Sequence, residues 1–212
     1  FLYWAVNELD GAGAIQTTAS HNPIQYNGFK ISGPGAAPIG RESGLQEIEA
    51  LAAGCTYQAG DESPAAEHQD LWEGYREHVH RFLPVSLLDS TVRLKVAVDA
   101  SNGMAGTMVP KVFAGVPGLE LFELHFENDQ GSFVHEPNPL VESNLRWTQE
   151  AVREHGCDFG VCFDGDADRC VLVDEQGHSV GCDLATAWLA PNFLTNVGGV
   201  VYDLRSSNIL PE

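Results

Sequence analysis

The sequence is poor in basic residues, and it also lacks any long apolar run. Among its 212 residues 11 are basic and 30 are acidic, which gives a formal net charge of −19. A field of this sign repels phosphate backbones and anionic lipid, so we expect no nucleic-acid partner and no membrane association. No stretch approaches the ~18 unbroken apolar residues of a membrane helix. Because its only lysines are Lys30, Lys95 and Lys111, an anionic substrate needs a metal, helix N-termini or basic groups outside this chain.

The N-terminus lacks both an initiator methionine and the features of a signal peptide. The segment from Phe1 to Asp10 has no basic region and no small-residue cleavage motif. We therefore expect no signal peptide, and we expect the chain to be a piece of a longer protein. Hydrophobic residues make up 43% of the sequence, which is enough for a packed core and excludes wholesale disorder.

The cysteines form no C-x-x-C pair. Their odd number, 5, argues against a secreted disulfide framework and for a reducing compartment, so we predict a cytoplasmic location. Cys162 and Cys170 lie in apolar runs, which favours buried thiols over a zinc site.

Helical and strand periods alternate along the chain, which predicts layers of helices and sheets in an α/β fold. Buried-type or alternating runs predict strands at residues 14–18, 29–31, 94–99, 119–126, 159–163, 170–174 and 200–204. Helical spacing predicts helices near residues 45–52, 67–82, 104–113, 143–155 and 183–194. We expect Ser43 and Asp183 to cap the first and the last of these helices.

A tight acidic segment between two predicted strands carries the strongest local signal. Three carboxylates alternate with small residues and are followed by a cation: Asp164, Gly165, Asp166, Ala167, Asp168, Arg169. Carboxylates this close repel one another unless a cation lies among them, and an all-oxygen set favours a hard ion such as Mg²⁺ or Ca²⁺ over zinc. Arg169 suits an anion that bridges to the metal.

Two other interpretations of this segment compete with the metal site. A calcium loop of the EF-hand type is disfavoured because its sixth position, which needs glycine, is Arg169, and because its flanks are predicted strands. A charged hairpin turn on an acidic surface is the simpler alternative, since Asp and Gly are ordinary turn residues. The position of Arg169 favours the metal site.

A second signal is the turn Thr17-Thr18-Ala19-Ser20-His21-Asn22-Pro23 at the end of a predicted strand. A hydrolase based on Ser20 and His21 is disfavoured, because adjacent side chains rarely face each other and no G-x-S-x-G elbow surrounds them. Downstream, Asn27-Gly28-Phe29-Lys30 predicts a hairpin-like return that could bring Lys30 beside Ser20. A serine at a strand end, a nearby lysine and a separate Mg²⁺-type loop together suit phosphoryl transfer.

Together these motifs resemble the α-D-phosphohexomutase superfamily, and most closely its phosphomannomutase/phosphoglucomutase branch. The likeness extends to the segments 98–103, 137–140 and 202–207, so it covers nearly the whole chain in the right order. It implies consecutive three-layer α/β/α domains with mixed sheets, in a chain truncated at both ends. By resemblance, residues 1–87 are the later part of domain I, residues 88–196 are domain II, and residues 198–212 open domain III.

The resemblance also implies a mechanism. By this resemblance, we expect Ser20 to carry a phosphoryl group, to give it to a hexose phosphate (mannose or glucose), and to recover another from the bisphosphorylated sugar. We likewise expect Mg²⁺ to be bound by Asp164, Asp166, Asp168 and the group on Ser20. Lys30 matches the general acid/base. Substrate-binding roles fall to Asn22, Lys30 and Arg169, while catalytic roles are assigned to Ser20, Lys30, His21 and Arg169.

Two alternatives to this activity remain open. One is phosphoglucosamine mutase, because substrate choice depends on the third domain that this chain lacks. The other is a non-catalytic, metal-binding fragment of such an enzyme. In either case we expect the 212-residue piece alone to have little or no mutase activity. The sequence does not indicate whether the protein is a monomer or an oligomer.

Overall fold

The computed structural model describes residues 1–55, 65–194, 199–202, 204 and 206–209. The chain divides into two compact units, each described here by itself. The N-terminal unit comprises Phe1–Ala19 and Asn27–Phe82, and the C-terminal unit comprises Ser20–Tyr26 and Leu83–Glu212. The segment that contains Ser20 therefore counts with the C-terminal unit. The assignment of residues 1–87, 88–196 and 198–212 to particular domains stays a prediction.

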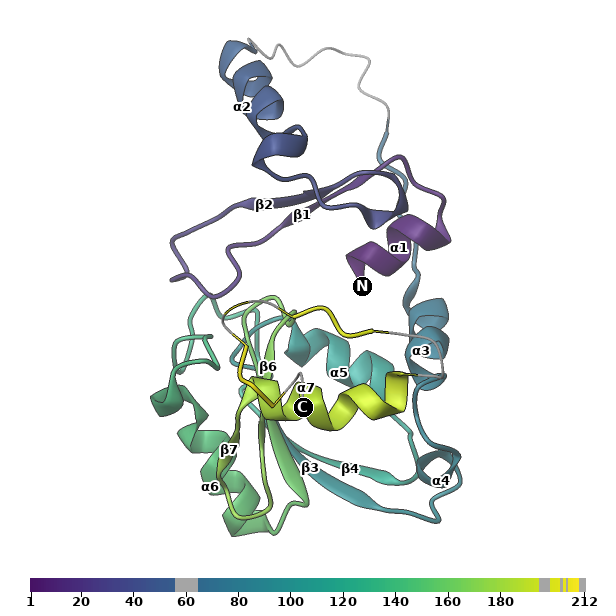
Figure 1. Cartoon of the computed structure of the whole chain (residues 1–212), viewed down its shortest axis with the longest axis vertical. Coiled ribbons are helices and arrows are strands. Elements are labelled where there is room, and N and C mark those ends of the chain that lie inside the picture. The colour runs from purple at the N-terminus through teal and green to yellow at the C-terminus, as the bar shows by residue number, and fades with distance from the viewer. Residues whose placement is uncertain (56–64, 195–198, 203, 205, 210–212) are drawn as a thin grey trace. The chain divides into compact units, whose positions relative to one another are not determined.

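The N-terminal unit is built around a short antiparallel hairpin and an aromatic cluster. Its elements are α1 (Leu2–Glu8), β1 (Ala14–Thr17), β2 (Phe29–Ser32), the 3-10 helices Pro34–Ala36 and Arg41–Ser43, α2 (Leu45–Gly54) and α3 (Trp72–His80) (Figure 1). Phe1 and Trp4 meet Trp72 and Tyr75 of α3, with ring centroids 4.7 Å apart for Phe1–Trp72 and 5.4 Å for Trp4–Tyr75. Large aromatic surfaces thus join α1 to α3.

The C-terminal unit contains a five-stranded mixed sheet in the order β4-β3-β5-β6-β7. Its elements are α4 (Val85–Leu88), β3 (Leu94–Asp99), α5 (Ala105–Phe113), β4 (Leu119–Leu124), the 3-10 helix Glu142–Leu145, α6 (Arg146–His155), β5 (Phe159–Phe163), β6 (Cys170–Val173), β7 (Ser179–Val180) and α7 (Cys182–Phe193). β3 runs parallel to both β4 and β5, whereas β5–β6 and β6–β7 are antiparallel. The predicted mixed α/β architecture is confirmed.

The two faces of this sheet are covered by different helices. Side chains alternate along a strand, so Val96 and Val98 point to one face, where they cluster with Val109 of α5. Ala97 points to the other face and clusters with Ala151 and Val152 of α6. Right-handed crossovers explain this arrangement, because β4 and β5 lie on opposite sides of β3. At such a reversal of strand order, a crevice opens at the carboxyl ends of the two central strands, β3 and β5.

One predicted helix cap and one predicted helix start are wrong, although α2 begins at Leu45 as expected. Ser43 lies in a 3-10 helix and accepts a hydrogen bond from the Gly40 N–H at 2.8 Å, while Gly44 precedes α2. The helix predicted from residue 67 begins at Trp72, whose N–H donates to the Asp70 carboxylate at 3.0 Å. A local side chain–backbone bond therefore coincides with the start of α3, and another draws the Ser43 side chain back to Gly40 and away from α2.

Three further expectations need correction. Gly181, not Asp183, precedes α7, and Asp183 lies in its first turn. No strand forms at residues 200–202 of the predicted strand 200–204, and residue 203 lies outside the described part of the chain. Cys157 and Cys162 are buried, but Cys170 and Cys182 are exposed. An apolar sequence run therefore did not mean burial for Cys170, which lies at the start of β6 next to the acidic segment.

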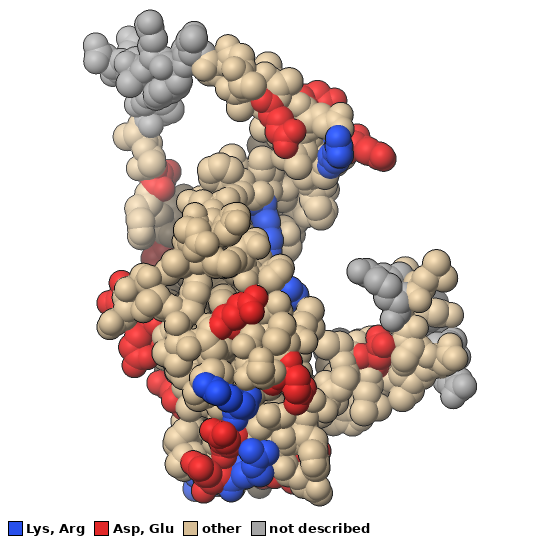
Figure 2. All heavy atoms as spheres, turned by 90° about the vertical axis from the view of Figure 1, so that its left-hand side faces the viewer, with Lys and Arg blue, Asp and Glu red and all other residues tan. Residues whose placement is uncertain are grey.

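Surface charge is mixed on the face that Figure 2 displays. Acidic and basic side chains lie side by side in its lower part and form no continuous basic surface among the residues shown in colour. Within the described ranges, no helix combines the length and the apolar character required to cross a bilayer.

The α6 side of the sheet gives a direct test of the packing. Val152 has an exposed fraction of 0%, whereas Val85 of α4 is 72% exposed. We expect Val152→Ala to lower the free energy of unfolding by about 2 kcal/mol, because it removes two buried methyl-sized groups and leaves a cavity. The matched control Val85→Ala should change it by less than about 0.5 kcal/mol. Urea unfolding of both variants makes the measurement, and equal losses would contradict the assigned core.

Candidate functional site

The site lies where the chain leaves β5. Phe163 pairs with Cys170 across the antiparallel β5–β6 ladder, so residues 164–169, here called the acidic loop, form a tight connection between these strands. The loop follows the carboxyl end of β5, beside the carboxyl end of the parallel strand β3. This edge of the sheet is where ligands bind in α/β folds of this kind. The topology therefore puts the predicted metal-binding residues at a suitable place.

The carboxylate of Asp164 organises the acidic loop. Its Oδ1 accepts hydrogen bonds from the N–H groups of Asp168 and Arg169, both at 3.1 Å. The side chain of Asp164 is completely buried. Ala167 adopts a left-handed conformation with φ of 59°, which curves the chain back around this carboxylate. One buried acceptor thus fixes the course of the loop.

A second loop, the serine loop (residues 20–26), touches the acidic loop through the backbone. Ser20 has a φ of 55°, an uncommon conformation for a residue with a side chain. A Cβ atom built on Gly165 would lie 2.3 Å from the carbonyl oxygen of Ser20. Only glycine permits this approach, so the small residue between two aspartates is required by the contact between the loops.

The hydroxyl of Ser20 lies between a carboxylate and a guanidinium group. It donates to Asp164 Oδ2 at 3.2 Å and accepts from Arg169 Nη2 at 2.9 Å. Arg169 also binds Asp164 Oδ2 through Nε at 2.9 Å and Nη2 at 2.7 Å. The same Nη2 contacts Nδ1 of His21. Since a guanidinium only donates, Nδ1 is the acceptor and the neutral ring carries its proton on Nε2.

Electrostatics at Asp164 favour a bound cation. Burial is the largest cause that raises the pKa of Asp164, and the negative charge of Asp166 raises it further. Hydrogen bonds and charge from Arg169 oppose these effects but do not cancel them, so the pKa lies above its ordinary value. A raised carboxyl pKa means that ionisation is costly in this environment, and a bound cation removes that cost.

The carboxylates of the acidic loop fit a divalent metal ion. One oxygen from each of Asp164, Asp166 and Asp168 lies within 4.8 Å of the others. Asp164 and Asp166 are buried, and Asp168 is exposed, so the group opens to solvent on one side. Oxygen-only donors suit hard cations. The donor set is therefore compatible with a divalent ion, while Mg²⁺ itself stays a prediction.

The structure brings most of the predicted site residues together, but it does so within one unit. Ser20, His21 and Arg169 are in contact with one another or with Asp164. Asn22 belongs to the serine loop and is exposed. Lys30 lies on β2 of the N-terminal unit, opposite Gln16. Its expected place beside Ser20 stays a prediction.

Sequence reasoning missed the turn after β3 as part of the site. The Ser101 hydroxyl donates to the carbonyl oxygen of Phe163 at 2.6 Å, and the Met104 N–H donates to that of Gly165 at 2.9 Å. A Cβ atom on Gly103 would lie 2.5 Å from the same Gly165 oxygen. The motif Asp-Ala-Ser-Asn-Gly at a strand end was visible, yet only the adjacency of β3 and β5 reveals that this turn supports the acidic loop.

Two family models match the chain. Residues 1–58 match the model described as phosphoglucomutase/phosphomannomutase, alpha/beta/alpha domain I, and residues 73–177 match that of alpha/beta/alpha domain II. Both models come from the family that the sequence motifs resemble. Together they cover the segments that contain the serine loop and the acidic loop.

Individual relatives agree with these matches. A phosphomannomutase of Escherichia coli is 36% identical over 216 residues, covering 97% of this chain and 47% of that protein. A protein named phosphohexose mutases from Xanthomonas campestris pv. campestris (strain B100) is 36% identical, covering 96% of this chain and 45% of its own length. The crystal structure of a phosphoglucomutase/phosphomannomutase family protein from Burkholderia thailandensis superposes with a TM-score of 0.65 at 30% identity, covering 86% of this chain and 39% of that one. The chain thus spans slightly less than half the length of the curated relatives it matches.

The contact between the two loops predicts a large effect of a minimal change. Gly165→Ala should lower the free energy of unfolding by about 1–3 kcal/mol, because the added methyl group overlaps the Ser20 carbonyl. Gly54→Ala is the matched control, since no atom lies within 4 Å of a Cβ built at this helical glycine. The control should leave stability unchanged or raise it by up to about 1 kcal/mol. Thermal or urea unfolding distinguishes the two, and a neutral Gly165→Ala would refute the close approach.

Proposed function

The chain belongs to the phosphoglucomutase/phosphomannomutase family, and on that premise we propose that it supplies the phosphoserine and metal-binding loops of a phosphohexomutase. In this proposal, the whole protein interconverts the 1-phosphate and the 6-phosphate of a hexose, mannose or glucose, through a bisphosphorylated sugar. The printed names of the relatives, a phosphomannomutase and phosphohexose mutases, support this substrate class.

The observation that carries the proposal is the position of the Ser20 hydroxyl. It lies within hydrogen-bond distance of both Asp164 and Arg169, residues that follow it by more than a hundred positions in the chain. Ser20 keeps a left-handed backbone in this position, which persists only where surrounding contacts hold it. A role in the turn alone would not require the Ser20 hydroxyl to contact both a buried carboxylate and a guanidinium group.

The same groups suit a phosphorylated serine. Arg169 donates through two nitrogens, a geometry that matches phosphoryl oxygens as well as carboxylates. Phosphorylation of Ser20 removes the hydroxyl proton that Asp164 now accepts and adds a charge of about −1.5 to −2 beside it. The carboxylate and the phosphoryl group then repel each other, so the modified state needs more positive charge than Arg169 alone provides.

A divalent ion, held by Asp164, Asp166 and Asp168, meets that need. When bound, Mg²⁺ would polarise the phosphoryl group and neutralise charge on the serine oxygen as it leaves. The residues of the chain do the remaining work: Asp164 orders the loop, and Arg169 orients the group on Ser20.

Phosphoryl transfer also requires a proton acceptor. We assign this role to Lys30, which would take the proton of the sugar hydroxyl as that oxygen attacks phosphorus and the bond to Ser20 Oγ breaks. His21 contacts the Arg169 guanidinium through Nδ1, which favours a positioning role over proton transfer. Asn22, exposed on the serine loop, is proposed to bind substrate.

The proposal also includes the domain assignment. Residues 1–87 would form the later part of domain I, residues 88–196 domain II, and residues 198–212 the start of domain III. On this assignment, the groups that choose among hexose phosphates lie outside this chain. All activity measurements therefore use the full-length protein.

The first test removes the phosphoryl acceptor. Ser20→Ala should lower mutase turnover by about three orders of magnitude or more, because no other group can carry the phosphoryl intermediate. The control Ser43→Ala changes an exposed serine of a 3-10 helix and should leave turnover unchanged. Intact mass spectrometry should find phosphate on the wild type and none at position 20 of the variant. Near-normal turnover of Ser20→Ala would overturn the mechanism.

The second test removes one metal ligand while keeping its shape. Asp166→Asn should raise the dissociation constant for Mg²⁺ by about tenfold or more, since even indirect partners of metal ligands contribute that much. Activity should fall in parallel. Asp129→Asn, an exposed position, serves as the control of equal charge. If activity titrates with Mg²⁺ identically in Asp166→Asn and the wild type, the acidic loop is not the metal site.

A further inference from the structure

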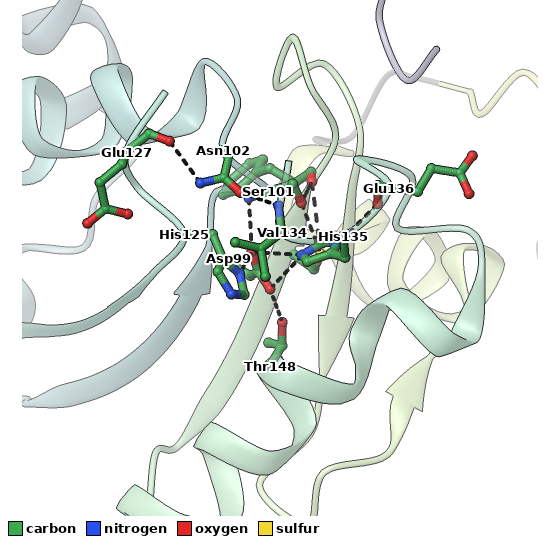
Figure 3. A network of polar contacts seen from close by, with 11 residues as sticks. Asp99, Ser101, Asn102, His125, Glu127, Val134, His135, Glu136 and Thr148 are labelled. Atoms are coloured by element: carbon green, nitrogen blue, oxygen red, sulfur yellow. Dashed lines mark hydrogen bonds and ion pairs between the residues drawn. The ribbon is translucent and has the colours of Figure 1, made fainter. Parts of the chain in front are cut away.

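His135 occupies an unusual position between two hydrogen-bond acceptors. Its Nδ1 lies 2.9 Å from the carbonyl oxygen of Glu136, which can only accept, so Nδ1 carries a proton. Its Nε2 lies 3.3 Å and 3.2 Å from the two carboxylate oxygens of Asp99. An ionised carboxylate also only accepts, so Nε2 needs a proton as well. The hydrogen bonds are satisfied together only when His135 is an imidazolium ion (Figure 3).

The partner of this cation is the buried carboxylate of Asp99, which accepts hydrogen bonds from several elements of the fold. Asp99 ends β3 and is completely buried, and the side chain of His135 is 2% exposed. His125, which follows β4, approaches Asp99 Oδ1 through Nδ1 at 3.0 Å, and Thr148 of α6 donates to Oδ2 at 3.4 Å. Figure 3 shows these side chains converging on Asp99. A buried ion of this kind is tolerated only because it is paired and hydrogen-bonded.

The charges around the pair support the same protonation state. Burial lowers the pKa of His135, but the hydrogen bond and the charge of Asp99 outweigh it and leave the pKa raised, against a smaller opposing effect of Arg146. Burial raises the pKa of Asp99, but hydrogen bonds from His125 and His135 outweigh it and leave the pKa lowered. Trp147 stacks on His135, and the Arg146 guanidinium lies 3.7 Å from the centre of the Trp147 ring.

The carboxylate of Asp99 is connected to the acidic loop through Ser101. Asp99 Oδ1 accepts from the Ser101 N–H at 2.9 Å, and the Ser101 hydroxyl donates to the carbonyl of Phe163 at 2.6 Å. Ser101 and Asn102 both have left-handed backbones, with φ of 50° and 52°. Such conformations persist only where surrounding bonds hold them. Asn102 supplies two such bonds, to the Val134 N–H and the Glu127 carbonyl, both at 2.8 Å.

We infer that the ion pair of His135 and Asp99 is a positioning device for the acidic loop, acting through Ser101, and that the affinity of this loop for a divalent cation depends on the protonation of His135. The inference rests on the proposed function only for the identity of the metal loop. Neither His135 nor Asp99 belongs to the acidic loop; both act through the turn that supports Phe163, the residue before Asp164.

The direction of the pH effect follows from the two shifts. The pKa of His135 is raised, so the contribution of the pair is complete at low pH and is lost as the pH rises through that value. The pKa of Asp99 is lowered, so its contribution is lost only as the pH falls through a value below the usual range. Cation binding by carboxylates alone improves with rising pH and then stays level. A decline on the alkaline side is therefore the signature of His135.

The experiment measures Mn²⁺ binding to the full-length protein by electron paramagnetic resonance between pH 6 and pH 9. We expect the wild type to bind Mn²⁺ more weakly at the alkaline end. His135→Gln and Ser101→Ala should each raise the dissociation constant about tenfold at neutral pH, and His135→Gln should abolish the alkaline decline. His178→Gln, whose side chain is 72% exposed on the β6–β7 turn, should behave as the wild type does.

A measurement on the wild type covers the case in which a variant fails to fold. Nitrogen NMR of the histidine rings should show both nitrogens of His135 protonated at pH 7. A neutral ring would overturn the inference, and so would wild-type affinity and pH profile in His135→Gln. Zinc found on Asp99 and the two histidines by elemental analysis would also overturn it, because the cation would then be a metal ion and not a proton.

These outcomes separate the inference from the proposed function. If the full-length protein lacks mutase activity but shows the alkaline decline and the protonated ring, the function fails and the inference stands. If turnover is normal but the alkaline decline is absent, the inference fails alone. Absence of Mn²⁺ binding to the wild type would contradict both, since the acidic loop would then hold no divalent ion.

Discussion

The buried carboxylate of Asp164 is the group on which the candidate site depends. It receives two backbone N–H groups of its own loop, two nitrogens of Arg169 and the hydroxyl of Ser20. Each of these bonds compensates part of the cost of burying a negative charge. The shape of the acidic loop, the position of the arginine and the approach of the serine loop are therefore consequences of one electrostatic requirement.

A second buried carboxylate lies on the neighbouring strand, and the cost of burying its negative charge is compensated by different partners. Asp99 is the last residue of β3 and Asp164 directly follows β5, and the two strands are parallel neighbours. Hydrogen bonds from His125 and His135 leave the pKa of Asp99 lowered, whereas Asp164 shares its environment with Asp166 and retains a raised pKa. The lowered pKa of Asp99 suits a structural support. The raised pKa of Asp164 suits the binding of a cation.

Strand order explains why these groups gather at one edge. The chain crosses from β3 to β4 on one side and returns to β5 on the other, so α5 and α6 cover opposite faces and leave the carboxyl ends of β3 and β5 open. Close backbone contacts follow, and glycine is needed at 103 and 165 because a Cβ atom at either would overlap a carbonyl oxygen. The fold thus requires glycine at these two positions of the site, as it does at other close backbone approaches such as Gly118.

The sequence by itself determined the layered fold, the strands that flank the acidic loop and the residue types of the site, because alternation, helical spacing and clustered carboxylates are local properties. It gave the wrong cap at Ser43, the wrong start for α3 and the wrong burial for Cys170. One hydrogen bond in each of the first two cases, and the exposure of one strand end in the third, decided the outcome. The family resemblance led us to expect Ser20 near Asp164, 144 positions away, but only the tertiary structure shows their hydrogen bond, and only it joined Asp99 to His135. Such contacts depend on strand order and on backbone approach between distant segments, and no local pattern encodes either.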